Sequence, residues 1–248
     1  RRLEVGFQIT MQVRGLLATV ILLFPLAVLA AVPPTAPRDA SLTPVTAVAP
    51  AAVAVPGNLV VNGDFESSSL APGCWWNLEN APVTAGLAGI TAWGPAAEID
   101  YVNNGTGCEY ISLPHQGQAQ LGIHLQDESF LGDGFCFELT APVHAGEAYV
   151  LSFFVMANTS FEVGIGAVEV GLSNDAASFG TLLVSASGNT AEWTYVEHEF
   201  VAAQDADFLC VQPAAGVPAW NLLDDFSLVS NVVPADSHSW GTVYGMYR

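Results

Sequence analysis

The chain has 248 residues and is strongly acidic, with 24 Asp and Glu residues, 5 basic residues and a formal net charge of −19. All the basic residues are Arg, and no Lys or Arg occurs between Asp39 and Tyr247. This composition argues against a nucleic-acid partner, because nothing could neutralise phosphates and release their counterions, and it disfavours phosphate-bearing cofactors for the same reason.

Residues 11–30 are typical of an export signal, and residues 1–10 precede Met11, the expected start of that signal. A short basic segment containing Arg14 precedes the apolar run Leu16–Ala30, which ends in small residues before a cleavage point. A transmembrane anchor is the alternative, but an apolar run of this length, interrupted by Pro25, falls short of the roughly 20 residues that span a bilayer. We therefore expect cleavage near Ala31 and a protein that is secreted or exposed at a cell surface and not membrane-spanning.

Two further segments lack the texture of a globular domain. Residues 31–56 are nearly all Ala, Val, Pro and Thr, which predicts a disordered linker or stalk. Residues 231–248 form a short tail that ends in SWGTVYGMYR. Trp240, Val243 and Tyr247 fall at helical spacing, so the tail is either a brief amphipathic turn or a frayed terminus.

Residues 57–230 show the pattern of one all-β domain. Short runs of β-branched and aromatic residues alternate with clusters of Gly, Asn, Asp and Pro. Both faces of Ala148–Ala157 are apolar, so this strand should lie in the interior of a sheet. The number and spacing of strands predict an antiparallel two-sheet β-sandwich or jelly roll. The expected strands are Leu59–Val61, Gln118–Leu125, Gly134–Glu138, Ala148–Ala157, Ala167–Leu172, Thr181–Ser185, Thr194–Val201, Ala206–Gln212 and Asn221–Val229.

All four cysteines lie in this domain, and an even number in an exported chain predicts two disulfides. No CxxC or Cys/His spacing suggests zinc. Of the three possible pairings we expect Cys74 with Cys108, which brackets a Trp-rich loop, and Cys136 with Cys210, which joins two expected strands.

Several segments, taken in order, resemble a known family. They are NLVVNGDFE (58–66), GITAWGPAAEIDYVN (89–103), AYVLSFFVMAN (148–158), WTYVEHEFVA (193–202) and NLLDDFSLV (221–229). Together they resemble galactose-binding-like jelly-roll domains, as found in bacterial carbohydrate-binding modules and in N-terminal domains of bacterial cell-surface proteins. The resemblance covers nearly all of residues 57–230 and implies a bacterial cell-surface or secreted location, with the first and last strands side by side.

The resemblance also implies a structural calcium where those two strands meet. The matching groups are the Asp64 carbonyl, the Glu66 carboxylate, a backbone oxygen near Gln118 and the Asp224 carboxylate. Calcium prefers such oxygen ligands. The alternatives are that Glu66 and Asp224 are ordinary strand-end acids, or that Asp225 takes the place of Asp224 if the register differs by one residue.

Aromatic side chains in the loops suggest a ligand surface, because pyranose rings stack their C–H faces on Trp and Tyr. In the alternative, Trp93 and one of the pair Trp75 and Trp76 cap the core, as large aromatics often do. The candidate ligand-binding residues are Trp75, Trp76, Trp93, Tyr101, Tyr110 and Trp220.

No catalytic arrangement stands out. A carboxylate pair such as Glu98 and Asp100 has no significance in so acidic a chain, and the His residues have neither metal-ligand nor triad spacing. We therefore expect a non-catalytic, monomeric domain that binds a glycan or another cell-surface component. The alternative is a structural or adhesive surface domain of the same fold without a sugar site.

Overall fold

The computed structural model describes residues 7–13, 16–22, 55–79, 86–93, 98–103, 108, 111–125, 132–160 and 163–231. The chain divides into two compact units, Arg1–Thr46 and Ala47–Arg248. In the first unit, β1 (Phe7–Val13) and β2 (Leu16–Leu22) pair as an antiparallel hairpin. No helix in the described part of the chain is long and apolar enough to cross a membrane. Export and cleavage of the first 30 residues stay predictions, and most of the expected linker and tail lies outside the described residues.

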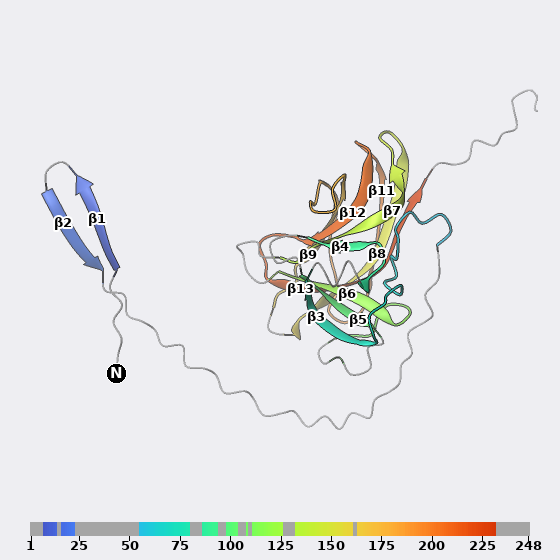
Figure 1. Ribbon diagram of the computed structural model, residues 1–248, viewed down its shortest axis with the longest axis horizontal. Helices are drawn as coiled ribbons and strands as arrows, with labels where there is room; N and C mark the ends of the chain where they lie inside the picture. The colour runs from blue at the N-terminus through green and yellow to red at the C-terminus, as the bar shows by residue number, and fades with distance from the viewer. Residues whose placement is uncertain are drawn as a thin grey trace, which may run out of the picture. The chain divides into compact units, whose positions relative to one another are not determined.

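The second unit is built from two antiparallel sheets, which confirms the expected β-sandwich (Figure 1). One sheet has the strand order β10-β9-β12-β7-β4 and the other β11-β8-β13-β6-β5-β3. The strands are β3 (Gly73–Glu79), β4 (Ile90–Ala92), β5 (Glu98–Asn103), β6 (Ala119–Leu125), β7 (Phe135–Val143), β8 (Ala148–Asn158), β9 (Ala167–Ser173), β10 (Thr181–Ser187), β11 (Thr194–Val201), β12 (Ala206–Pro213) and β13 (Ala219–Ser230).

The core lies between the sheets and is rich in aromatic rings. Phe153 of β8 and Phe226 of β13 stack with ring centroids 4.9 Å apart, and Phe135 and Phe137 of β7 pack onto Phe226 from the other sheet. Strand β8 pairs with β11 on one side and β13 on the other, as expected for a strand with two apolar faces. Burial of these side chains is the main stabilising contribution to the sandwich.

The expected first strand, Leu59–Val61, is instead an isolated bridge between the two sheets. Leu59 N–H donates to the Leu228 carbonyl of β13, and Val60 pairs with Leu139 of β7. Because its two sides bond to strands of different sheets, the segment cannot extend either ladder, and the chain turns at Asn62 and Phe65, both with positive φ. The implied proximity of the opening segment and the last strand is observed.

Three strands were not expected from the sequence: β3, β4 and β5. Strand β5 alternates an inward pair, Ile99 and Tyr101, with the outward Asp100, and its acids and Asn103 resemble a loop in sequence. Strand β3 contains a register shift between Trp75 and Leu78 that breaks its alternation. The segment expected to be a Trp-rich loop is therefore the edge of a sheet.

Both disulfides have the expected pairing, Cys74 with Cys108 and Cys136 with Cys210. Cys136 and Cys210 lie directly opposite each other on β7 and β12, with their Cα atoms 4.0 Å apart. Both side chains are buried on the side of the sheet away from the core.

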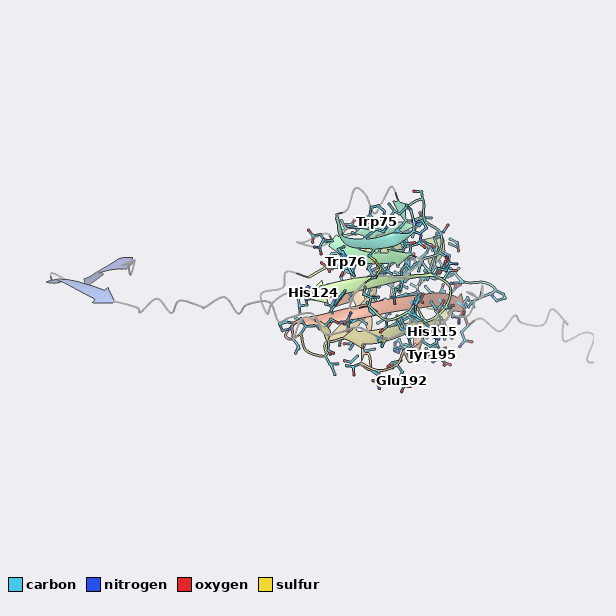
Figure 2. All side chains as sticks on the ribbon, turned by 90° about the horizontal axis from the view of Figure 1, so that it is seen from below. Trp75, Trp76, His115, His124, Glu192 and Tyr195 are labelled. Atoms are coloured by element: carbon cyan, nitrogen blue, oxygen red, sulfur yellow. A yellow bond between two sulfur atoms is a disulfide. The ribbon has the colours of Figure 1, made fainter. Side chains whose placement is uncertain are left out.

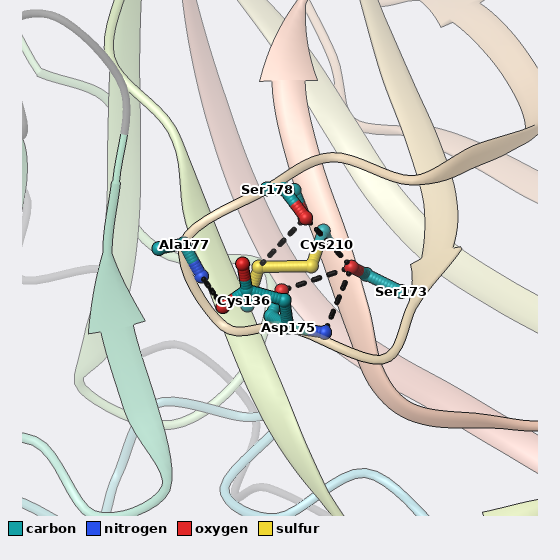
Figure 3. The surroundings of a disulfide bond; sticks show 6 residues. All are labelled: Cys136, Ser173, Asp175, Ala177, Ser178 and Cys210. Carbon is teal, nitrogen blue, oxygen red and sulfur yellow. Dashed lines mark hydrogen bonds between the residues drawn. A yellow bond between two sulfur atoms is a disulfide. The ribbon is translucent and has the colours of Figure 1, made fainter.

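A hydrogen-bonded loop covers this second disulfide (Figure 3). The Ser173 hydroxyl donates to the Asp175 carbonyl and accepts from the Asp175 N–H, and it lies 3.1 Å from the Ser178 hydroxyl. The Cys136 sulfur lies 3.9 Å from the Ser178 carbonyl oxygen. The loop therefore shields the bond from solvent, which favours a structural role for this disulfide.

Candidate functional site

The outward-pointing side of the six-stranded sheet carries most of the candidate residues, and we call it the outer face. Along β5, β6 and β13 the inward side chains, such as Tyr101, Leu121 and Leu223, belong to the core. The cross-strand partners Asp100, Gly122 and Leu222 therefore point outward. Figure 2 shows the labelled residues of the six-stranded sheet spread from Trp76 toward Tyr195.

Two tryptophans, one from the central strand β13 and one from the edge strand β3, meet on the outer face. Trp220 of β13 is 4% exposed, and Trp76 of β3 is 42% exposed. Their ring centroids lie 5.8 Å apart at an interplanar angle of 65°, an edge-to-face contact. Trp76 thus offers an exposed indole that is braced from below by a buried one.

Gly122 of β6 makes room for this pair. A Cβ at this position would lie 2.9 Å from Trp220 Nε1 and 3.2 Å from the Asp100 Cβ, closer than ordinary contact. The absence of a side chain therefore lets the indole of Trp220 lie across β6 toward β5.

Asp100 is a carboxylate set into the same surface and only 7% exposed. Its Oδ1 accepts a hydrogen bond from the Asn77 N–H at 3.0 Å. Burial raises the pKa of Asp100 to about 6 and the charge of Glu98 adds to this, while the Asn77 amide and the Trp220 side chain lower it. The carboxylate is mostly ionised at neutral pH and is an acceptor beside the aromatic pair.

Asp133 brings a further acid to this part of the sheet. Its Oδ2 accepts from the His124 N–H at 2.7 Å, and its own N–H donates to the His124 carbonyl at 3.0 Å. Burial raises the pKa of Asp133 to about 8, the charges of Asp100 and Glu98 add to the rise, and the His124 amide opposes it. Burial lowers the pKa of the His124 ring, so this histidine is neutral at pH 7.

Residues 111–118, which we call the covering loop, are tied down across the middle of the outer face. The Trp193 indole donates to the Leu113 carbonyl at 3.1 Å, and Gln120 Nε2 donates to the Ser112 carbonyl at 2.5 Å. His115 stacks on Phe154 of β8 with ring centroids 3.4 Å apart. The loop thereby separates the Trp76 region from the β11 edge of the sheet.

The expected calcium ligands Glu66 and Asp224 contact one short stretch of this loop and β6. Glu66 Oε1 accepts from the N–H groups of Gln118 at 2.6 Å and Ala119 at 2.8 Å. Asp224 Oδ2 accepts from the Gln116 N–H at 3.2 Å. The structure thus brings the opening segment and the last strand to the same loop, and Gln118 contacts Glu66 through its N–H group.

Asp224 is fully buried and lies beside a second acid, Asp225. Burial raises its pKa to about 9, and the charge of Asp225 contributes, against hydrogen bonds from neighbouring amides. Burial also raises the pKa of Asp225, with His115 opposing and the charge of Asp64 adding. His115 Nδ1 lies 2.6 Å from Asp225 Oδ2. Within the described residues no three His, Cys, Asp or Glu side chains converge to hold a metal ion, although the expected site uses only two side chains.

The remaining candidate aromatics do not form one surface. Trp75 is half-buried against the core, and its indole donates to the Ala71 carbonyl. Trp93 lies on the other sheet, where its ring contacts Phe179. The expectation that Tyr101 faces a ligand is wrong: it is fully buried, and its hydroxyl donates to the Phe65 carbonyl. Tyr110 lies outside the described residues.

Sequence reasoning missed the polar partners of the aromatic pair. Asp100 was visible only as one carboxylate among many, and Asp133 and Gly122 gave no signal of their own. At the β11 edge it also missed Tyr195, which is exposed and donates its hydroxyl to Glu197. Only the alternation of β5 could have indicated that Asp100 and Tyr101 point to opposite faces.

Comparison with known proteins finds similar folds but no family. No protein-family model matches the chain, and no curated protein matches it. Among solved structures it is similar to the CBM22-1 xylan-binding domain of Paenibacillus barcinonensis Xyn10C, at 17% identity over 57% of this chain and 85% of that one, with a TM-score of 0.39.

Two further solved structures are also similar to the chain. The N-terminal cellulose-binding domain of Cellulomonas fimi β-1,4-glucanase C is 23% identical over 58% of this chain and 90% of that one, with a TM-score of 0.38. The K1 cleaved adhesin domain of Lys-gingipain from Porphyromonas gingivalis W83 is 13% identical over 58% of this chain and 92% of that one, with a TM-score of 0.41.

Proposed function

We propose that this chain is a non-catalytic carbohydrate-binding domain that binds glycan on the outer face of its six-stranded sheet, around Trp76. The observation that carries the proposal is the exposed indole of Trp76, held in place by the buried indole of Trp220. An indole fixed in this way can stack on the C–H face of a pyranose ring with little loss of side-chain entropy.

Polar groups beside the indole supply hydrogen bonds. Asp100 lies against Trp220 and is joined to the residue that follows Trp76 through the Asn77 N–H. A flat apolar surface with a few fixed acceptors is the usual composition of a small-ligand site. The arrangement serves to bind and orient a sugar ring.

One feature favours the alternative, a structural or adhesive surface domain without a sugar site. The covering loop is anchored on Phe154 and Trp193 and occupies the middle of the face where a long glycan would otherwise lie. A glycan can therefore bind only on the β3 side of the sheet. This side suits a short glycan, or the end of a long one, better than the interior of a long glycan.

Structural calcium is part of the proposal, with Glu66 and Asp224 as the side-chain ligands and carbonyl oxygens of Asp64 and Gln118 completing the set. The donor types fit a hard cation. The raised pKa of the buried Asp224 supports it, because the carboxylate lacks a compensating positive charge that a cation would supply. The ion would tie the opening segment to the last strand.

We also propose an extracellular or cell-surface location. The two disulfides support it, because such bonds persist in oxidising compartments and are rare in reducing ones.

The decisive experiment is binding to a panel of soluble and insoluble glycans by wild type, Trp76→Ala and Leu182→Ala. Leu182 is a matched control, because it is an apolar residue, 50% exposed, on β10 of the other sheet. We expect Trp76→Ala to weaken binding about tenfold and Leu182→Ala to leave it unchanged. Equal losses in both variants would contradict a site at Trp76, and no binding by the wild type to any glycan would favour the adhesive alternative.

A further inference from the structure

We propose that the glycan bound at Trp76 carries a protonated amine, so that the preferred ligand is an amino sugar without its N-acetyl group. This inference rests on the proposed function and concerns the same site. The structure pairs an exposed indole with acids that have no positive partner, and an ammonium group complements both.

The negative charge of the site comes from Glu98 and Asp100, whereas the nearby Asp133, whose pKa burial raises to about 8, is mostly protonated at neutral pH. Glu98 and Asp100 lie on β5 and Asp133 precedes β7, and each of the first two raises the pKa of Asp133 through its charge. Asp100 lies directly opposite Gly122 on β6, next to the indole of Trp220. The acids are thus close enough to interact with one another and with a ligand at the aromatic pair.

No basic side chain compensates this charge. The sequence has neither Lys nor Arg between Asp39 and Tyr247. The histidine bonded to Asp133, His124, has a pKa lowered by burial and is uncharged at neutral pH. A positive charge at this position has to come from a ligand or from the solvent.

The neighbouring side chain of Gln120 offers a further hydrogen-bond acceptor. Gln120 points outward from β6 two residues before Gly122, is 1% exposed, and uses its Nε2 on the Ser112 carbonyl. Among the residues that the structure describes, none forms a hydrogen bond with its Oε1. An unpaired buried acceptor of this kind calls for a donor, and an ammonium group has three donors and no acceptor.

Trp76 provides the other half of the recognition. A cation over the face of an indole is attracted by the negative face of the ring, and the interaction strengthens where water is partly excluded. A charge-assisted hydrogen bond to the Asp100 carboxylate adds to it. A neutral sugar gains the stacking and hydrogen bonds to Asp100 but no attraction between opposite charges, and a uronic acid is repelled by the same carboxylates.

The test compares three β-1,4-linked tetrasaccharides that differ at carbon 2: the glucosamine tetramer, the N-acetylglucosamine tetramer and cellotetraose. Titration calorimetry on the full chain at low salt should show the glucosamine tetramer binding about tenfold tighter than either of the others. The preference should shrink as salt is added, because salt screens exposed charges.

Variants locate the preference. Asp100→Asn keeps an oxygen for the Asn77 N–H but removes the negative charge, so we expect the affinity ratio of the glucosamine tetramer to cellotetraose to fall from about tenfold to about twofold or less. Glu197→Gln, at an exposed acid on the β11 edge, is the matched control and should retain the preference. Retention of the preference in Asp100→Asn would overturn the inference.

The comparison of the three tetramers on the wild-type protein does not depend on whether the variants fold. Equal wild-type affinities for the three tetramers, all weakened by Trp76→Ala, would overturn the amino-sugar inference and leave the proposed function in place. Binding of none of them by a chain that binds no other glycan would overturn both.

Discussion

Replacing Gly122 with alanine tests the packing on which the binding site depends. The new Cβ would lie 2.9 Å from Trp220 Nε1 and 3.2 Å from the Asp100 Cβ, whereas unstrained carbon contacts fall at about 3.5–4.0 Å. The indole or the β5 backbone must therefore move by several tenths of an ångström. Such overpacking costs about 1–3 kcal/mol, partly offset by the gain of about 0.5–1 kcal/mol when Ala replaces Gly in a strand.

We therefore expect Gly122→Ala to lower the free energy of unfolding by about 1–2 kcal/mol and to weaken glycan binding, since Trp220 braces Trp76. Urea denaturation followed by tryptophan fluorescence measures the first effect, and a shift of the midpoint at constant slope would confirm it. Gly73→Ala is the matched control, because its Cβ would meet Trp75 Nε1 at an ordinary 3.6 Å. A Gly122→Ala protein as stable as the Gly73→Ala protein would refute the placement of the indole over β6.

Three other outcomes are expected. The first is the loss of stability when Cys136→Ala and Cys210→Ala remove the second disulfide, whose cysteines are 74 residues apart in sequence. The free energy of unfolding should fall by about 4 kcal/mol on the chain-entropy model, and the melting temperature by about 10 °C. An unchanged melting temperature would contradict a structural role for this disulfide. The domain should also lose stability as pH rises from about 4 to 8. The pKa of Asp133 is about 8 in the folded state and 3.8 in the unfolded chain, so between these values the folded state holds a proton that the unfolded state has released. Urea midpoints at pH 5 and pH 8 measure this loss, and Asp133→Asn should reduce it. Calcium at 100 times its dissociation constant should add about 2.7 kcal/mol, seen as a higher melting temperature than in chelator, and the increment should vanish in Glu66→Gln; coincident wild-type melts would leave Glu66 and Asp224 as ordinary acids.

The β-sandwich could be predicted from the sequence because the residue patterns that indicate its strands are local. The doubly apolar run at 148–157 predicts an interior strand without reference to any neighbour, and β8 is one. The disulfide pairing also followed from chain position. Conversely, β5 was missed because a strand with acids on its outer face resembles a loop until its partner is known.

The candidate site could be predicted only in part, because it depends on register between strands far apart in the chain. Trp76 was identified by its residue type, whereas the role of Gly122 follows from its pairing with Asp100 on one side and Leu222 on the other. Tyr101 was wrongly expected at the surface, since a shift of one residue along a strand moves a side chain to the opposite face. The spacing of residues along the sequence does not show which residues lie opposite each other on neighbouring strands.

The position of β13 has a consequence for how the domain assembles. The last strand of the sandwich lies between β8 and β6 and also bonds to the opening segment through Leu228. Until residues 219–230 are present, β8 and β6 each have an unpaired edge, and the larger sheet exists as two separate pieces. A chain shortened before Ala219 should therefore aggregate, and the intact chain should fold slowly and late, after its final strand has become available.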